Sequence, residues 1–188
     1  MNARRSFFAA GLALLGFGRR AWAQLATPSA PPRYVPLTRP VTIPVSAVST
    51  PWQPVPFTAE SSLPRRSSGL AKTDEGGRRV LISGVLFRNP TQLSALCVTC
   101  PHEQCQVDLV TDTERLARMS PPLRSGQARG ATHPLFECGC HFSVFDAAAD
   151  GARISGESPR GLYRFRIGGI RDGSVEITDI EEAALSEV

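Results

Sequence analysis

Cys-Pro-His-Glu-Gln-Cys at residues 100–105 and Cys-Gly-Cys-His at residues 138–141 are the two stretches in which this chain concentrates its reactive side chains. The 188 residues include five cysteines and three histidines, and six of these eight lie in the two stretches. Thiols and imidazoles gathered in this way are typical of residues that bind one ligand together or bond to one another. The two stretches therefore indicate a single site built from two loops.

Three kinds of site fit these residues. If the chain is exported, the cysteines could form structural disulfides beside bystander histidines. A structural zinc ion could take mixed cysteine and histidine ligands, although Cys97-x2-Cys100 has no matching second pair. The third is a 2Fe–2S cluster, because Cys100-x-His102 and Cys138-x2-His141 each offer one thiolate and one imidazole. Two thiolates would then bind one iron and two imidazoles the other.

The third interpretation also explains the remaining cysteines, Cys105 and Cys140, which follow Cys100 and Cys138 by five and two residues. They can bond the two loops together, and such a bridge would stiffen a cluster held at an exposed tip. The complete pattern, Cys-x-His-x2-Cys with Cys-x-Cys-His, resembles the Rieske iron–sulfur protein family in its disulfide-bridged branch. By this resemblance, Cys105–Cys140 is the family disulfide.

The resemblance implies one 2Fe–2S cluster with four ligands in this chain. Cys100 and Cys138 would bind the inner iron through sulfur. His102 and His141 would bind the outer iron through the nitrogen that faces solvent. Ser143 lies two residues after His141, where the family has a hydroxyl that bonds a cluster sulfide.

The residues outside the two stretches predict an all-β domain. The chain holds 16 glycines and 16 prolines, and short apolar runs are separated by turn residues without a long helical period. We expect a hairpin turn at residues 171–174 and a short helix at Thr113–Met119, inside a long connection at residues 112–133. Prolines confine the first two expected strands to sheet edges. The expected strands are residues 41–45, 55–57, 78–88, 93–98, 163–167 and 175–177.

The resemblance adds a specific architecture to this all-β expectation. It implies the Rieske fold, with three antiparallel sheets and a small cluster-binding subdomain at one end. The cluster-binding loops would span residues 97–107 and 136–162. Within the second, residues 156–162 are similar to the family's Gly-x2-Pro-x2-Leu loop, which shields the cluster.

Some positions depart from the family members that oxidise quinols. Phe145 stands where those members usually have a tyrosine whose hydroxyl bonds a ligand sulfur, so a lower potential is expected. Glu103 and Gln104 occupy the tip that enters an apolar quinol pocket, and a carboxylate there opposes burial. Residues 141–146 are similar to the small subunit of arsenite oxidase. Overall the chain is also like the iron–sulfur subunit of quinol–cytochrome c reductase.

The amino-terminal residues predict export. Arg4-Arg5 precedes an apolar run at residues 7–18, and Ala21-Trp22-Ala23 resembles a cleavage site, which is the order of a twin-arginine-type signal. The first 23 residues hold four of the 21 basic residues and none of the 17 acidic ones, so the remainder is neutral. A nucleic-acid partner is therefore not expected. The predicted organisation is a signal at 1–23, a proline-rich linker at 24–40, the Rieske domain at 41–180 and a C-terminal tail at 181–188.

These features predict a one-electron transfer protein or subunit of the periplasm. It would serve an oxidoreductase, as the arsenite oxidase small subunit does, rather than act as a catalyst alone. Its partners would be redox proteins, namely a donor subunit and an acceptor such as cytochrome c. Two alternatives remain: the iron–sulfur subunit of a membrane quinol–cytochrome c reductase, and a binding module stapled by zinc or disulfides. An uncleaved signal would anchor the protein in the inner membrane.

Other conspicuous residues have structural interpretations. Cys97 is expected to be a small buried residue of a strand. His133 is expected to be an exposed bystander, and Trp52 to pack in the core or at an edge. Arg164 and Arg166 are expected to form a solvated strand face.

Overall fold

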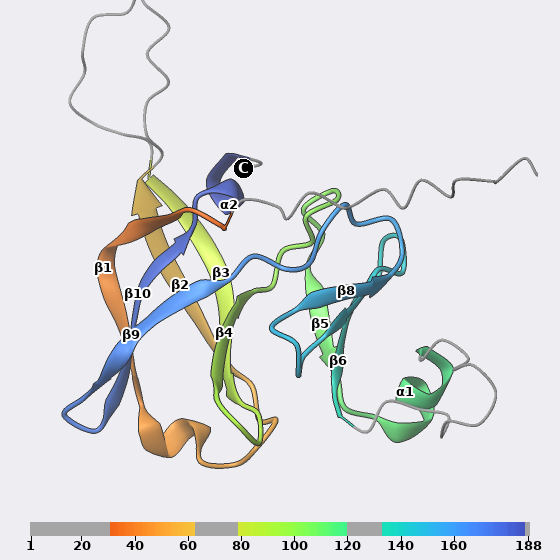
Figure 1. The fold of residues 1–188 in the computed structure, drawn as a ribbon, viewed down its shortest axis with the longest axis horizontal. Coiled ribbons are helices and arrows are strands. Elements are labelled where there is room, and N and C mark those ends of the chain that lie inside the picture. Colours follow the sequence, from red (N-terminus) through yellow and green to blue (C-terminus); the bar gives the residue numbers. More distant parts are fainter. Residues whose placement is uncertain (1–30, 63–78, 120–132, 187–188) are drawn as a thin grey trace, which may run out of the picture. The chain divides into compact units, whose positions relative to one another are not determined.

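The computed structural model describes residues 31–62, 79–119 and 133–186, and these residues form three antiparallel sheets (Figure 1). The expected all-β class and the three antiparallel sheets are confirmed. The predicted signal at residues 1–23 lies outside the described residues. Within the described ranges, no helix has the length and apolar character that a membrane crossing requires.

The three sheets account for all the named strands of the described residues. The first sheet has the order β1-β10-β9, formed by Tyr34–Pro44, Ser174–Glu181 and Phe165–Arg171. The second has the order β2-β3-β4, formed by Val55–Ser62, Arg79–Arg88 and Leu93–Cys97. The third has the order β5-β6-β7-β8, formed by Val107–Val110, Leu135–Cys138, Val144–Asp146 and Ala152–Ser155. The short helices are η1 (Val45–Val48), α1 (Thr113–Met119) and α2 (Ala183–Ser186).

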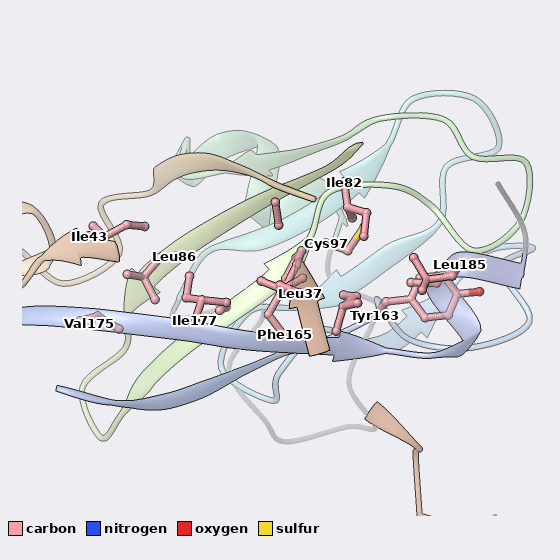
Figure 2. Packing of buried hydrophobic residues seen from close by; sticks show 14 of the residues in the cluster. Leu37, Ile43, Ile82, Leu86, Cys97, Tyr163, Phe165, Val175, Ile177 and Leu185 are labelled. Atoms are coloured by element: carbon pink, nitrogen blue, oxygen red, sulfur yellow. The ribbon is translucent and has the colours of Figure 1, made fainter. Parts of the chain in front are cut away.

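The first two sheets enclose one apolar core. Its side chains come from all six of their strands, and Figure 2 shows Leu86, Cys97 and Ile177 gathered between the strands. Along β10, Val175 and Ile177 are buried in alternation, as expected for a strand with one face in a core. The register then shifts between Ile177 and Asp179, which changes the face that the last residues of the strand present.

Strand β3 passes between this core and a second one. It alternates between exposed and buried residues up to Ser83, and the next four residues are all buried. Leu86 belongs to the first core, whereas Val85 and Phe87 belong to the second. The second core also contains cysteines of both sequence stretches. The strand therefore joins the candidate site to the larger core.

Most expected elements are present. Helix α1 has the predicted bounds, and the expected hairpin joins β9 to β10 with positive φ at Asp172 and Gly173. Two consecutive positive φ angles are typical of a type I′ turn, whose twist matches that of the strands. β1 and β2 lie at sheet edges, as their prolines predict.

Two expected boundaries are wrong. The proline-rich linker at 24–40 ends early, because residues from Tyr34 onward form β1 and Leu37 is buried. Pro36 and Pro40 are tolerated because β1 pairs with β10 alone, and the register shifts beyond Pro36.

The expected C-terminal tail at residues 181–188 is folded for most of its length. It begins with the last residue of β10 and continues into α2, where Ala184 and Leu185 are buried against the first core. Apolar side chains at these positions cover the end of the sheet. Residues 187–188, and residues 120–132 of the long connection, lie outside the described residues.

Gly84 has no room for a side chain. It lies beneath Phe57 and Phe165, whose rings meet edge to face at 4.9 Å, and an added Cβ would approach Phe165 to 2.8 Å. We predict that Gly84→Ala lowers the free energy of unfolding by about 1–3 kcal/mol, the usual cost of overpacking. Chemical denaturation measures this change. Gly139→Ala is the matched control, because its Cβ would meet nothing within 4 Å. Equal stability of the two variants would contradict this packing.

Candidate metal centre

The first candidate loop is a closed hairpin that follows β4. An isolated bridge pairs Thr99 with Gln106, and the backbone N–H of Cys100 donates to the carbonyl of Cys105 at 2.7 Å. The N–H of Gln104 returns to the carbonyl of Cys100 at 3.0 Å, with Gln104 at a positive φ. These bonds fix the backbone on both sides of His102.

The second candidate loop is the tight connection between β6 and β7. Cys138 ends β6, and its N–H donates to the carbonyl of Ser143 at 2.9 Å. Phe142 closes the turn at a φ of 53°. Because β5 pairs with β6 so that Val107 lies opposite Cys138, the two loops emerge side by side from adjacent strands.

A disulfide joins the two loops. It links Cys105 to Cys140 across 35 residues of sequence, and the structure leaves Cys97, Cys100 and Cys138 as free thiols. The bridge that the sequence suggested is therefore present. It also removes Cys105 and Cys140 from any set of metal ligands.

The two free thiols of the loops are buried together. Cys100 and Cys138 are each about 1% exposed and belong to the second core. Burial raises the pKa of the Cys100 thiol. The backbone N–H of His102 opposes this rise in pKa, and the neighbouring Cys138 thiol adds to it. A bound metal would favour the thiolate form of such a desolvated pair.

The two histidines of the loops face each other at the surface. The ring centroids of His102 and His141 are 4.7 Å apart and the rings lie edge to face. Each Nε2 lies near a carboxylate: that of His102 is 4.0 Å from Glu157, and that of His141 is 3.9 Å from Glu103. Both Nε2 atoms are thus directed toward charged residues of the surface.

The other nitrogen of His102 points inward. Its Nδ1 is buried and lacks a hydrogen-bond partner among the described residues. Buried polar atoms are normally paired, so an orphaned imidazole nitrogen needs an explanation. A metal ion on the inner side of the ring provides one, and the residues present therefore fit a metal site. The nitrogen that this favours for His102 is the inward Nδ1, and not the solvent-facing nitrogen that the resemblance led us to expect.

The described donors fall into a sulfur group and a nitrogen group. The sulfur atoms of Cys105, Cys138 and Cys140 lie within 4.8 Å of one another, and so do the ligand atoms of His102, Glu103 and His141. Because Cys105 and Cys140 are bonded to each other, the free thiols near the site are Cys100 and Cys138, which are buried, whereas His102 and His141 are partly exposed. Cysteine and histidine groups in this arrangement could bind metal.

A third segment, residues 156–162, packs against both loops. Gly156 has a φ of 92°, and an added Cβ would lie 2.6 Å from the hydroxyl of Ser143. Ser143 is fully buried, and its hydroxyl accepts the N–H of Ser158 at 3.0 Å. Ser158 is also buried, and its side chain lies within hydrogen-bonding reach of the Cys100 thiol.

The sequence did not identify Ser158 or Glu157 as residues of the site. Both belong to the 156–162 segment, but their own types carry no signal. Their neighbours Cys100 and His102 lie more than fifty positions away in sequence. Only the folded arrangement brings them together.

His133 does not belong to this site, and the expectation that it is an exposed bystander is wrong. Its Nε2 lies 2.7 Å from Asp146, and its ring stacks on Trp52 with centroids 5.8 Å apart. Trp52 stacks in turn on Phe87, which fits the packing role expected for it. His133 is therefore a partly buried structural residue. Cys97 is buried in β4, as expected.

No protein-family model and no curated protein matches this sequence.

The disulfide predicts a measurable contribution to stability. Replacing both Cys105 and Cys140 by serine should lower the free energy of unfolding by about 2–4 kcal/mol, because the bridge restricts a long loop of the unfolded chain. Denaturant unfolding of the full chain measures the loss. Cys97→Ser, which removes a free thiol, is a control for cysteine substitution itself. Mass spectrometry that finds both thiols free in the purified protein would contradict the bridge.

Proposed function

We propose that this protein is a one-electron transfer protein or subunit of the periplasm that carries a Rieske-type 2Fe–2S cluster. The proposed ligands are Cys100, Cys138, His102 and His141. The observation that carries the proposal is the sorting of the donors, with two buried thiols on one side and two half-exposed imidazoles on the other. A cluster with two unlike irons requires that arrangement.

The alternative of a structural zinc ion fits these donors less well. Zinc in a structural site takes four ligands tetrahedrally around one point. Here the described donor groups divide by type, and Cys105 and Cys140 are bonded to each other. The orphaned Nδ1 of His102 further supports a ligand on the inner side of the imidazole.

When bound, the cluster would accept and release a single electron. The chain itself would hold the ligands in fixed loops, bury the thiols, and expose the edges of His102 and His141 as the route for the electron. Ser143 and Ser158 are the buried hydroxyls beside the ligands. The Ser143 hydroxyl accepts the N–H of Ser158, so its own proton could be donated to a cluster sulfur, whereas the Ser158 hydroxyl donates to the carbonyl of Arg160.

The surface around the histidines favours a protein partner with basic side chains. Glu103 and Glu157 have side chains 61% and 65% exposed, and each lies beside one imidazole. Phe142, at 70% exposure, follows His141 directly. An apolar residue with flanking carboxylates matches an apolar patch ringed by lysines or arginines. Burial of the same carboxylates in an apolar quinol pocket would be costly, which counts against the subunit of a quinol–cytochrome c reductase.

The ligand assignment predicts a loss of cluster in single variants. Alanine at Cys100, His102, Cys138 or His141 should abolish bound iron and the visible spectrum, because each fills a coordination position. Iron and sulfide analysis of the purified full chain measures this. His133→Ala is the matched control, since His133 pairs with Asp146 away from the site. A His102→Ala protein that keeps two irons per chain would refute the assignment.

The residue at position 145 predicts the range of the redox potential. Phe145 is buried in the same core as Cys100 and Cys138, and it offers no hydroxyl to a ligand sulfur. We therefore expect a midpoint in the middle of the span of about −150 to +300 mV that Rieske centres cover. Phe145→Tyr should raise it, because a new donor favours the more negative, reduced state. A wild-type midpoint at the upper limit, or no rise in the variant, counts against this proposal and favours a quinol-oxidising subunit.

A further inference from the structure

Glu181 is the one acidic residue that is fully buried among those that the structure describes, with 1% of its surface exposed. It ends β10, beyond the register shift at Ile177, and its backbone N–H donates to the carbonyl of Arg164 at 3.0 Å. A buried carboxylate is costly unless cations and hydrogen bonds compensate it. The buried carboxylate of Glu181 therefore needs cationic partners, and its burial needs a structural explanation.

Two arginines provide the partners. Arg164 donates from Nε to Glu181 at 2.7 Å, and Arg160 pairs with the other carboxylate oxygen through Nη2. The hydrogen bond to Glu181 raises the pKa of Arg164. Arg164 keeps 39% of its side chain exposed, as expected for a solvated strand face, but its guanidinium also pairs with a buried carboxylate, which was not expected. Arg166, which was expected on the same face, lies 3.8 Å from Asp179.

The two arginines come from different parts of the chain. Arg164 pairs with Leu96 of β4 and directly precedes Phe165, the first residue of β9, so it lies among the strands of the first two sheets. Arg160 belongs to the 156–162 segment, and its guanidinium also lies 4.5 Å from the ring centroid of Tyr163. One carboxylate thus ties that segment to the end of β10.

The backbone of Arg160 is connected to the candidate metal centre through Ser158. Its carbonyl accepts the hydroxyl of Ser158 at 2.8 Å, and the N–H of Ser158 donates to Ser143 at 3.0 Å. Ser158 in turn lies beside the Cys100 thiol. These contacts therefore run from Glu181 through Arg160 and Ser158 to Ser143, in the loop that follows Cys138.

We propose that Glu181 is a positioning residue, whose buried carboxylate holds Arg160 and so keeps residues 156–162 closed over the Cys100 thiol. The closing of the segment does not depend on which metal is bound. Its effect on a redox potential rests on the function proposed above. When the segment opens, Ser158 moves away from Cys100, and the surroundings of that sulfur change.

Hydrogen exchange in the full chain tests the closing directly. We expect Glu181→Gln and Arg160→Gln to speed exchange of the 156–162 amides by about tenfold or more, since charge-assisted hydrogen bonds of this kind change an opening equilibrium by that order. Arg164→Gln removes the other partner of the same carboxylate and should leave these amides near wild type. Glu176→Gln is a second control, because Glu176 lies on β10 like Glu181 but pairs with Arg171 of β9, at 3.3 Å.

The midpoint potential of the iron-loaded protein separates positioning from simple charge. Glu181→Gln removes a negative charge and Arg160→Gln a positive one, so a through-space effect would move the potential in opposite directions. Opening of the segment instead moves the potential in the same direction in both variants. Arg160→Lys, which keeps a cation for Glu181, should recover most of the wild-type exchange and potential.

Several results would overturn the proposal. Exchange of the 156–162 amides at the wild-type rate in Arg160→Gln would do so. Faster exchange in Arg160→Gln together with wild-type exchange in Glu181→Gln would also do so, since the stacking of Arg160 on Tyr163 would then hold the segment. If Glu181→Gln does not fold, Arg160→Gln and Arg160→Lys decide the matter, because Arg160 is 36% exposed and its side chain can turn into solvent. A chain that binds no cluster would refute the function and leave the exchange result standing.

Discussion

The pairing of β5 with β6 is the constraint on which the site depends. It sets Val107 opposite Cys138, so the hairpin that ends at β5 and the hairpin that begins at β6 emerge beside each other. The Cys105–Cys140 disulfide then fixes the tips of the same two loops. With both ends held, the thiols of Cys100 and Cys138 are buried and the imidazoles of His102 and His141 lie at the surface. Donor groups held in this way could bind a metal ion with little rearrangement of the loops.

The sheets outside the site supply its support. β4 leads into the first loop only three residues before Cys100, and its residues pack into both cores. Segment 156–162 approaches from another side, tied to Ser143 by hydrogen bonding and to the end of β10 through Glu181. The two loops and this segment are therefore attached to the larger core at separate places. Each of these attachments restricts the motion of the cysteine and histidine side chains of the site.

Local patterns in the sequence were sufficient for much of this arrangement. The spacing of cysteines and histidines predicted two loops and their bridge, and the turn at Asp172 and Gly173 predicted a hairpin. The failures share one physical cause, which is pairing over long distances. The sequence near Pro36 does not indicate that this segment will pair with β10 as an edge strand. The sequence near Arg164 likewise does not indicate a buried carboxylate at position 181. His133 was likewise misjudged because its partner Asp146 and the stacked Trp52 come from other segments.

The central claim is that two unlike irons lie between the two pairs of ligands. A Mössbauer spectrum of the full chain, purified after growth on the Mössbauer isotope of iron and chemically reduced, tests this most directly. The account predicts two distinct iron signals of equal intensity, because one iron has only sulfur ligands and the other has two nitrogens. A single kind of iron site would contradict the account. So would a protein that contains zinc in stoichiometric amount and no iron.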